Sequence, residues 1–455
     1  MNSQFAVRVA VLGAGALIAF SIIFFRLWYL EVLSGDDYLV QAQENRTRSI
    51  TVQAPRGKIL DRNEKPLVEN RTAPSLQVRP AELPQRTGEA NDVLKELAEV
   101  SRMKYKRIKR EIKEQTAELP ASPVTLKRDA PAKLVYHLAE RADMFPGVTA
   151  DEITVRKYPN GNLASHLFGF VSEVNEDQLA QPQYEELNLG DQIGAAGLEA
   201  QYDNVLRGRN GAIEVPVDSF GNPRGRSISE IEPERGDDLV LSIDKNIQKV
   251  GEQAIAQFGK PAAFVVMNVN DGAVLGMGSF PNFDPSIYTP PVSFDKIEEL
   301  TEDPADPLFS NATQSGYPTG STFKLVTGTA SLEEDLTTPT EPIADTGVFD
   351  YAGRPWKNAG SQPYGSVNTT RALQVSSDIY FYKMGIRSEE ARDGAEADEN
   401  AFAKWATRLG FGSATGIDLP SENAGLVPTP EWRNELFEEA TDPKSCGGTD
   451  VVFDF

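Results

Sequence analysis

Gly320-Ser321-Thr322-Phe323-Lys324 places a hydroxyl and an amine three residues apart, at the start of the apolar run Phe323-Lys324-Leu325-Val326. If a helix begins near Ser321, this spacing puts the Ser321 hydroxyl and the Lys324 amine on one face, one turn apart. A serine hydroxyl is a weak nucleophile until a nearby base takes its proton, and a lysine serves as that base when burial or neighbouring charge lowers its pKa. The pair can therefore form an acyl-serine.

A serine three residues before a lysine is by itself a weak signal, because both residue types are common. The same spacing occurs at Ser101 and Lys104, at Ser242 and Lys245, and at Ser293 and Lys296. The ordinary interpretation of such a match is an exposed helix start or a turn. The surrounding sequence therefore has to identify the nucleophile.

The composition argues against several kinds of site. The chain has 455 residues, enough for two or three domains that each bury a core. It carries 45 Lys and Arg against 67 Asp and Glu, a net charge of -22, which argues against a nucleic-acid partner. One cysteine, Cys446, excludes an internal disulfide and a cysteine-based zinc site, and two histidines argue against a His-ligated metal or a Ser-His-Asp triad. We therefore expect no metal, no cofactor and a base other than histidine.

The amino-terminal segment has the composition of a membrane anchor. No charged residue occurs from Val9 to Phe25, and the apolar character continues to Leu30, which gives about the 20 residues that span a bilayer as a helix. The alternative is a cleaved signal peptide, but Trp28 and Tyr29 suit a membrane interface and no small-x-small cleavage site follows. We predict a short cytoplasmic tail at 1–8 and an uncleaved anchor at 9–30, with the rest of the chain on one side of the membrane.

Residues 36–235 predict a mixed α and β domain with many turns and no internal repeat. Residues 90–115 combine charged residues with apolar residues at helical spacing, which indicates one or two amphipathic helices with a solvated face. Three segments stand out here: 56–62, 158–169 and 197–202. We interpret them as structural, with glycines at turns and an Arg/Asp pair that fastens one strand to another.

A second domain is expected at 236–455. The run from Asp237 to Asp244 predicts a strand that leads into an amphipathic helix. Residues 262–268 and 273–279 predict a hairpin joined by Asp271-Gly272. The segment 281–317 is rich in Pro and Asp, so it is expected to be an irregular loop that leads to Ser321.

The motifs around Ser321 resemble those of the class B penicillin-binding proteins. They are Tyr317-Pro318-x-Gly320-Ser321-Thr322-Phe323-Lys324, with Asn311-Ala312 before it and Ser376-Ser377-Asp378-Ile379-Tyr380-Phe381-Tyr382 after it. In the amino-terminal half, the segments that resemble the pedestal of that family are 26–30, Asn45-Arg46, 56–62 and 197–202. The order and spacing are most similar to the elongation-type group, penicillin-binding protein 2, over nearly the whole chain.

The resemblance implies an α+β multidomain fold: a single transmembrane helix, a mixed α/β pedestal or dimerisation-type domain at 36–235, and a serine-transpeptidase (penicillin-binding) α/β domain at 236–455. It implies a peptidoglycan D,D-transpeptidase of cell-wall elongation and cell shape, anchored in the bacterial inner membrane with its catalytic domain outside the cytoplasm. The implied partners are stem peptides that end in D-Ala-D-Ala, β-lactam antibiotics, and a membrane-embedded glycosyltransferase of the elongation machinery.

Residue by residue, the resemblance makes Ser321 the nucleophile and Lys324 its proton acceptor. Ser376 matches the serine of the second motif, whose hydroxyl relays a proton to the leaving amine. Asp378 stands where many relatives carry Asn, and a carboxylate near Lys324 would favour the charged form of the lysine. Ser421-Glu422-Asn423 is a rival for the second motif, but it lies in a stretch that resembles a structural loop of the family.

The sequence departs from the family pattern after Asp378. No Lys-Thr-Gly or Lys-Ser-Gly follows, and Lys444-Ser445-Cys446-Gly447 has one residue too many. In the family this third motif lies on the strand that binds the substrate carboxylate and helps to frame the oxyanion hole. We therefore expect a fragment whose transpeptidase domain is incomplete at its carboxyl end and which is a poor enzyme on its own.

Two alternatives stay open. A serine β-lactamase would need an efficient deacylating base and is usually a secreted single domain, and turnover of nitrocefin would identify it. A non-catalytic scaffold of a wall-synthesis complex would use the amino-terminal half to bind partners and would carry a vestigial serine domain. Of these two alternatives, the absence of the third motif favours the non-catalytic scaffold over the β-lactamase.

Overall fold

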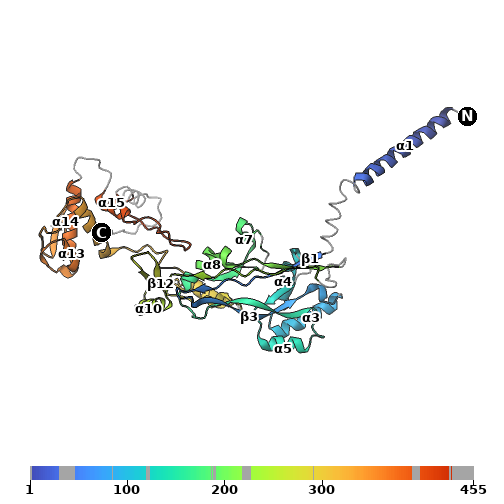
Figure 1. Cartoon of the computed structure of the whole chain (residues 1–455), viewed down its shortest axis with the longest axis horizontal. Helices are drawn as coiled ribbons and strands as arrows, with labels where there is room; N and C mark the ends of the chain where they lie inside the picture. Colours follow the sequence, from blue (N-terminus) through green and yellow to red (C-terminus); the bar gives the residue numbers. More distant parts are fainter. Residues whose placement is uncertain are drawn as a thin grey trace. The chain divides into compact units, whose positions relative to one another are not determined.

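The structure is a computed structural model of the chain. It describes residues 3–29, 47–84, 86–118, 123–185, 187, 191–217, 227–290, 292–391, 400–429 and 432. The chain divides into two compact units, Met1–Phe309 and Ser310–Phe455 (Figure 1). The predicted domain limits at 36–235 and 236–455 stay a prediction.

The first element of unit 1 is helix α1, Ser3–Trp28. Within the described residues, no helix combines the length and the apolar character that crossing a membrane requires. The anchor predicted at 9–30 is therefore not confirmed. Leu30 and the Asn45-Arg46 pair lie outside the described residues.

A mixed sheet runs through unit 1. Its longest strand, β3 (Pro66–Val78), pairs antiparallel with β5 (Val148–Lys157), in register from Glu69/Lys157 to Val78/Val148. The strand order is β10-β2-β3-β4, and β5 also pairs with β3. The other strands of unit 1 up to residue 240 are β1 (Thr47–Val52), β2 (Ile59–Leu60), β4 (Val124–Lys127), β6 (Val171–Glu173), β7 (Gln192–Gly194), β8 (Gly211–Pro216), β9 (Ser229–Ile231) and β10 (Leu239–Val240).

Helices cover one end of this sheet, where α3 and α5 lie beside β3 (Figure 1) and Leu94 and Leu97 of α3 share a buried cluster with Leu76 and Val78 of β3. The helices predicted at 90–115 are confirmed as α3 (Thr87–Ser101) and α4 (Tyr105–Glu118). The buried residues of α3 share one face, because they recur at helical spacing: Leu94, Leu97, Ala98 and Ser101. The short helices of unit 1 are α5 (Ala132–Glu140), α6 (Ser165–Phe168), α7 (Glu176–Leu179), α8 (Gly197–Gln201) and α9 (Asp203–Leu206).

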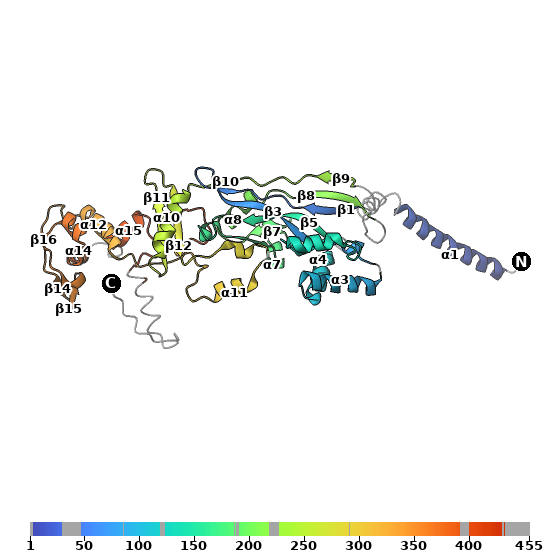
Figure 2. The same cartoon turned by 90° about the horizontal axis from the view of Figure 1, so that it is seen from below.

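The predicted hairpin is confirmed. Strand β11 (Ala262–Met267) pairs antiparallel with β12 (Val274–Phe280), and helix α10 (Lys245–Ala256) packs against both strands (Figure 2). A Cβ at Gly251 of α10 would lie 2.1 Å from the Phe264 ring, so only glycine lets this ring pack under the helix. The strand predicted from Asp237 to Asp244 is shorter than expected, since β10 covers only Leu239–Val240.

The loop predicted at 281–317 is wrong in part. It contains the 3-10 turn η4 (Pro285–Tyr288) and helix α11 (Phe294–Glu302). Phe294, Ile297 and Leu300 recur three residues apart, and the intervening Glu and Lys residues are good helix formers. The Pro residues that suggested a loop stand on either side of this helix, and Asp295 is the one Asp inside it, in the first turn.

Unit 2 combines helices with short strand pairs among its described residues. Its helices are α12 (Lys324–Glu333), α13 (Thr369–Val375), α14 (Asp378–Ala391) and α15 (Ala401–Arg408). Two strand pairs accompany them: β13 (Ile343–Asp345) with β16 (Gly365–Val367), and β14 (Val348–Tyr351) with β15 (Arg354–Lys357). A buried core cluster joins β13, β16, α13 and α14 and consists of Ile343, Val367, Ala372, Tyr380, Phe381 and Met384.

Glu199 is the centre of a buried ion network in unit 1. Its carboxylate accepts hydrogen bonds from Arg56 Nε at 3.0 Å and from Arg156 Nε at 2.6 Å, and its side chain is 0% exposed. Arg56 also donates to Asp203 Oδ1 at 2.8 Å. Burial by itself raises the pKa of a carboxyl group, but the two guanidiniums outweigh it and hold the pKa of Glu199 below its usual range.

This network confirms the structural interpretation of segments 56–62 and 197–202 and corrects its detail. Arg56 is fastened mainly to Glu199, a glutamate of the other segment, and additionally to Asp203. Gly197 has a φ of +57°, and a Cβ there would lie 2.6 Å from the backbone nitrogen of Gly169. Glycine is therefore required for α8 to approach closely enough to place Glu199 between the arginines.

We predict that Glu199→Ala lowers the thermal unfolding midpoint substantially, because it leaves two buried guanidiniums without their shared carboxylate. Removing one partner of a buried ion pair costs about 3–5 kcal/mol. Differential scanning calorimetry measures the change. The control is Glu69→Ala, which breaks the half-exposed pair of Glu69 with Lys157 and should cost roughly 0–1 kcal/mol. Equal losses in the two variants would contradict the prediction.

Candidate active site

Ser321 lies in the 3-10 turn η5 (Gly320–Phe323), which leads directly into α12. The predicted helix start near Ser321 is therefore confirmed, with a first turn tighter than an α-helix. Ser321 is exposed, whereas the Lys324 side chain is only 12% exposed. A serine at a helix entrance can meet a ligand from solvent, while the lysine behind it is held by its neighbours.

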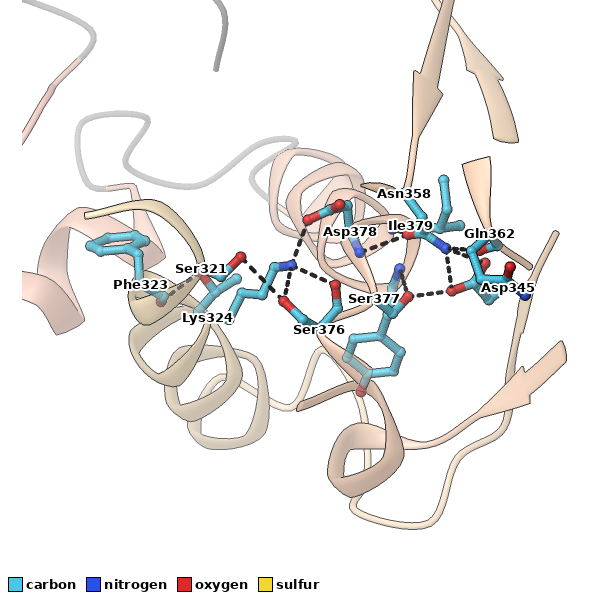
Figure 3. Close-up of polar contacts among 12 residues, drawn as sticks. Ser321, Phe323, Lys324, Asp345, Asn358, Gln362, Ser376, Ser377, Asp378 and Ile379 are labelled. Atoms are coloured by element: carbon cyan, nitrogen blue, oxygen red, sulfur yellow. Dashed lines mark hydrogen bonds and ion pairs between the residues drawn. The ribbon is translucent and has the colours of Figure 1, made fainter. Parts of the chain in front are cut away.

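The second predicted motif, which begins at Ser376, contacts Ser321 from the junction between α13 and α14. Ser376 lies between α13 and α14, and its Oγ donates to Ser321 Oγ at 3.1 Å. Lys324 Nζ donates to the same Ser376 Oγ at 3.0 Å. Figure 3 shows the resulting path from the amine through Ser376 to Ser321. The structure thus brings together all four predicted residues, Ser321, Lys324, Ser376 and Asp378.

Lys324 Nζ lies within hydrogen-bond distance of three acceptors. The acceptors are the Ser376 carbonyl oxygen at 2.8 Å, Ser376 Oγ at 3.0 Å and Asp378 Oδ1 at 2.5 Å. The Nζ atom also stands 5.8 Å from the centre of the Phe381 ring. Of the three acceptors, only the Ser376 hydroxyl can also donate a proton. A neutral Lys324 would therefore receive a proton through Ser376.

The backbone of Ser376 is in the left-handed region, with φ 54° and ψ 46°. It closes α13, because the N–H of Ser377 donates to the Ala372 carbonyl at 2.9 Å, and α14 begins two residues later at Asp378. A residue with a Cβ pays about 1–2 kcal/mol for this conformation. Strain of this kind is typical of residues that a site holds in place.

Two residues that the sequence analysis did not single out support this junction from the side away from Ser321. Asn358 Oδ1 accepts from the backbone N–H groups of Asp378 and Ile379, and Asp345 holds the other end of the Asn358 amide. The only local signal was a turn-like Asp345-x-Gly347 after an apolar pair of residues. Their part in the site depends on contacts with residues that are distant in the sequence.

The far end of α14 is held by an ion pair. Arg387 Nη2 lies 2.7 Å from Glu341 Oε1, and Arg387 Nη1 donates to the Leu336 carbonyl at 2.8 Å. Hydrogen bonds from Arg387 and Thr337 lower the pKa of Glu341 to about 2. Helix α14, which carries Asp378 at its start, is therefore fastened at both ends.

The rival serines lack this environment. Ser101 is buried and its Oγ lies 3.5 Å from the Ala98 carbonyl, Ser242 Oγ donates to the Val274 carbonyl at 2.7 Å, and Ser293 precedes α11. In the described part of the chain, none of the three hydroxyls is hydrogen-bonded to the lysine three residues later. Of the four serines that precede a lysine by three residues, Ser321 is linked to its lysine, Lys324, through the Ser376 hydroxyl.

The rival second motif is a structural loop, as predicted. Glu422 accepts from the Thr415 N–H at 2.8 Å, and Asn423 Nδ2 donates to the Gln314 carbonyl at 3.0 Å. Lys444-Ser445-Cys446-Gly447 lies outside the described residues. Among the residues that are described, no group of three or more His, Cys, Asp and Glu side chains is arranged to hold a metal ion.

Two family models match the chain. The model described as the penicillin-binding protein dimerisation domain matches residues 51–241, and the model of the penicillin-binding protein transpeptidase domain matches residues 262–447. The peptidoglycan D,D-transpeptidase MrdA of Escherichia coli is 29% identical over 452 residues. That match covers 96% of this chain and 68% of the relative.

Two solved structures are similar in fold. One is a complex between penicillin-binding protein 2 and MreC from Helicobacter pylori, with a TM-score of 0.73 and 24% identity, covering 86% of this chain and 71% of that chain. The other is described as "Structural coordination of polymerization and crosslinking by a peptidoglycan synthase complex". It has a TM-score of 0.61 and 28% identity, and the match covers 94% of this chain and 72% of that chain.

We predict that Ser376→Gly is more stable than Ser376→Ala by about 1 kcal/mol, because glycine adopts a positive φ without the penalty that a Cβ brings. Both variants lose the hydroxyl, so the comparison isolates the backbone conformation. Thermal unfolding midpoints measure the difference. A Gly variant that melts at or below the Ala variant would show that Ser376 is not held in the left-handed region.

Proposed function

The chain belongs to the penicillin-binding proteins that combine a dimerisation domain with a transpeptidase domain, and we propose that it is a peptidoglycan D,D-transpeptidase of the penicillin-binding protein 2 group, acting in cell-wall elongation and cell shape. The observation that carries the proposal is the path of hydrogen bonds from Lys324 through Ser376 to Ser321. A nucleophile, a relay and a base in contact are what acyl transfer needs when no histidine is present.

The proposed first step is acylation. Ser321 Oγ attacks the carbonyl carbon of the penultimate D-Ala and passes its proton to Ser376 Oγ, whose own proton moves to the neutral amine of Lys324. The tetrahedral intermediate then collapses, the C–N bond breaks, and the proton returns through Ser376 to the leaving amine of the terminal D-Ala. The product is an ester between Ser321 and the stem peptide.

The proposed second step transfers the acyl group. An amine of a neighbouring stem peptide attacks the ester carbonyl and loses its proton to the same path, and Ser321 leaves as the restored hydroxyl. Asp378 has a positioning role in both steps, because its carboxylate contacts Lys324 Nζ and keeps the amine beside Ser376. β-Lactams, which resemble D-Ala-D-Ala, would acylate Ser321 and stay attached.

The two alternatives predict different results with β-lactams. A β-lactamase would release the hydrolysed product and turn over nitrocefin repeatedly, whereas the proposed transpeptidase is acylated stoichiometrically. A non-catalytic scaffold would not react at all. The contact of Ser321 with Ser376, and of Ser376 with Lys324, favours a reactive site over the scaffold, since a vestigial domain has no reason to retain this path.

The proposed organisation follows the predicted domains. Residues 36–235 form the pedestal and residues 236–455 belong to the transpeptidase domain. The proposed partners are peptidoglycan stem peptides and a membrane-embedded glycosyltransferase of the elongation machinery. The glycosyltransferase is supported by the 28% identity to a chain of a structure described as a peptidoglycan synthase complex.

The proposed topology is a cytoplasmic tail at 1–8, an anchor at 9–30 in the inner membrane, and a body outside the cytoplasm. The absence of charge from Val9 to Phe25 supports the anchor, and Arg8 before it supports the orientation of the tail. Peptidoglycan lies outside the cytoplasm, so the proposed substrate supports an external body.

We expect protease that is added to intact spheroplasts to digest the body of the natural full-length protein, because the proposed topology exposes it on the outer side. Immunoblotting with antibodies against residues 236–455 measures the loss, and a cytoplasmic protein in the same cells is the control that must survive. Full protection of the body in spheroplasts with intact membranes would contradict the topology.

We further predict that Ser321 is the residue acylated by penicillin in the natural full-length protein. Mass spectrometry of a penicillin-labelled digest should place the adduct on the peptide that contains Ser321. The adduct should disappear in Ser321→Ala and persist in Ser293→Ala, the matched control with the same spacing to a lysine. An adduct on another serine would refute the assignment.

A further inference from the structure

The first turn of α14 is capped by side chains rather than by solvent. The N–H groups of Asp378 and Ile379 donate to Asn358 Oδ1 at 2.8 and 3.1 Å, and the Tyr380 N–H donates to Ser377 Oγ at 3.1 Å. Backbone N–H groups at a helix start have no partner within the helix, so these two side chains satisfy them. Asn358 follows β15 and lies 20 residues before Asp378, so this cap also sets where α14 begins in space.

The Asp345 carboxylate and the Gln362 carbonyl oxygen, which accepts from Asn358 Nδ2 at 2.7 Å, together determine which way the Asn358 amide points. Asn358 Nδ2 donates to both oxygens of Asp345, at 2.8 and 2.9 Å, and a carboxylate can only accept. The amide oxygen of Asn358 must therefore face α14. Ser377 Oγ also donates to Asp345, at 2.5 Å (Figure 3). The Gly347 N–H donates to Asp345 Oδ1 at 2.9 Å.

This polar cluster is buried. Asp345, Asn358 and Ser377 are 2%, 3% and 0% exposed. In a low-dielectric interior a hydrogen bond is stronger, and an unsatisfied polar group is costly, so the arrangement resists rotation of any one member. Asp345 stands at the end of β13, which makes the cluster a link between that strand and the start of α14.

Ser376 is held through its neighbours in sequence. Ser377 and Asp378 are both bonded to the cluster, and Ser376 is the left-handed residue immediately before them. In the described part of the chain, neither Asp345 nor Asn358 is hydrogen-bonded to Ser321 or Lys324. Any effect of these two residues on the nucleophile must therefore pass through the junction at 376–378.

We propose that Asp345 and Asn358 are positioning residues for acyl transfer: they fix the 376–378 junction so that the Ser376 hydroxyl and the Asp378 carboxylate meet Lys324. The inference rests on the proposed function, because it assigns these residues to the reaction of Ser321. It adds a layer behind the reacting groups that the motifs themselves do not contain.

The expected signature is a loss of rate without a loss of binding. Asn358→Ala removes the acceptor of two N–H groups at the start of α14, and a displacement of a reacting group by 1 Å costs about 10²-fold in rate. We expect the acylation rate constant for a fluorescent penicillin to fall 10–100-fold, on the order set by that displacement, while its non-covalent dissociation constant changes by less than about twofold. Both constants come from acylation rates measured over a range of penicillin concentrations.

A double-mutant cycle tests whether the effect passes through Ser376. Asn358→Ala, Ser376→Ala and the double variant are compared in the natural full-length protein, at a temperature well below every unfolding midpoint. If Asn358 acts by placing Ser376, the double variant should react about as slowly as Ser376→Ala alone. An equal fold-loss from Asn358→Ala in both backgrounds would overturn the proposal.

Two further variants keep the test independent of folding. Asp345→Asn has nearly the same shape but cannot accept from every donor, and it should show the same loss of rate with unchanged binding. Asn400→Ala is the matched control, because Asn400 Oδ1 also accepts two N–H groups at a helix start, those of Phe402 and Ala403, but caps α15. It should leave the acylation rate unchanged. A loss in Asn400→Ala as large as in Asn358→Ala would show a general effect on stability and overturn the proposal.

The outcomes separate the inference from the proposed function. A wild-type protein that acylates at Ser321, with Asn358→Ala and Asp345→Asn equally fast, overturns the inference and leaves the proposed function intact. A wild-type protein that is not acylated at all overturns both.

Discussion

The Asp345 carboxylate is the fixed acceptor on which the candidate site depends. A buried carboxylate must be satisfied by donors, and here the donors are the Asn358 amide, the Ser377 hydroxyl and the Gly347 N–H. Neither this carboxylate nor the Gln362 carbonyl oxygen can donate, so the two impose one orientation on the Asn358 amide, and in that orientation its oxygen caps α14. The position of α14 in turn fixes Ser376, and Ser376 is hydrogen-bonded to both Lys324 and Ser321.

Unit 1 also depends on a buried carboxylate that is hydrogen-bonded by several donors, but its donors are charged. Glu199 is fully buried and joins Arg56 to Arg156, residues that stand on separate segments of the chain. In unit 1 the donors are guanidiniums, which match a carboxylate with charge as well as geometry. In unit 2 the donors of Asp345 are neutral groups, so no opposite charge adds to the hydrogen bonds. Removing either acid leaves several buried donors without a partner.

The residues of the candidate site have less favourable backbone conformations than the residues that support them. Ser376 occupies a left-handed conformation that costs free energy, and Ser321 sits in a tight 3-10 turn at the entrance of α12. The left-handed conformation of Ser376 is tolerated because Ser377 and Asn358 behind it are buried and hydrogen-bonded. Ser321 and Ser376 are therefore exposed to a substrate, while the buried residues behind Ser376 hold its position.

The sequence by itself determined the features that neighbouring residues encode. The spacing of Ser321 and Lys324, the amphipathic helices α3 and α4, and the hairpin across Asp271-Gly272 all follow from local periodicity and turn chemistry. The resemblance of motifs then pointed to Ser376 and Asp378. Helix α11 was missed because the Pro and Asp residues around it dominated the local signal.

Only the tertiary structure decided how these pieces meet. Ser376 reaches Ser321 across 55 residues of sequence, and Asn358 caps a helix that begins 20 residues later. No periodicity or propensity encodes such a contact, because a hydrogen-bond partner at long separation depends on how helices and strands pack, and on which buried groups remain to be satisfied. The residues that form a motif can be found in a sequence, whereas the residues that hold the motif in place are defined by the fold.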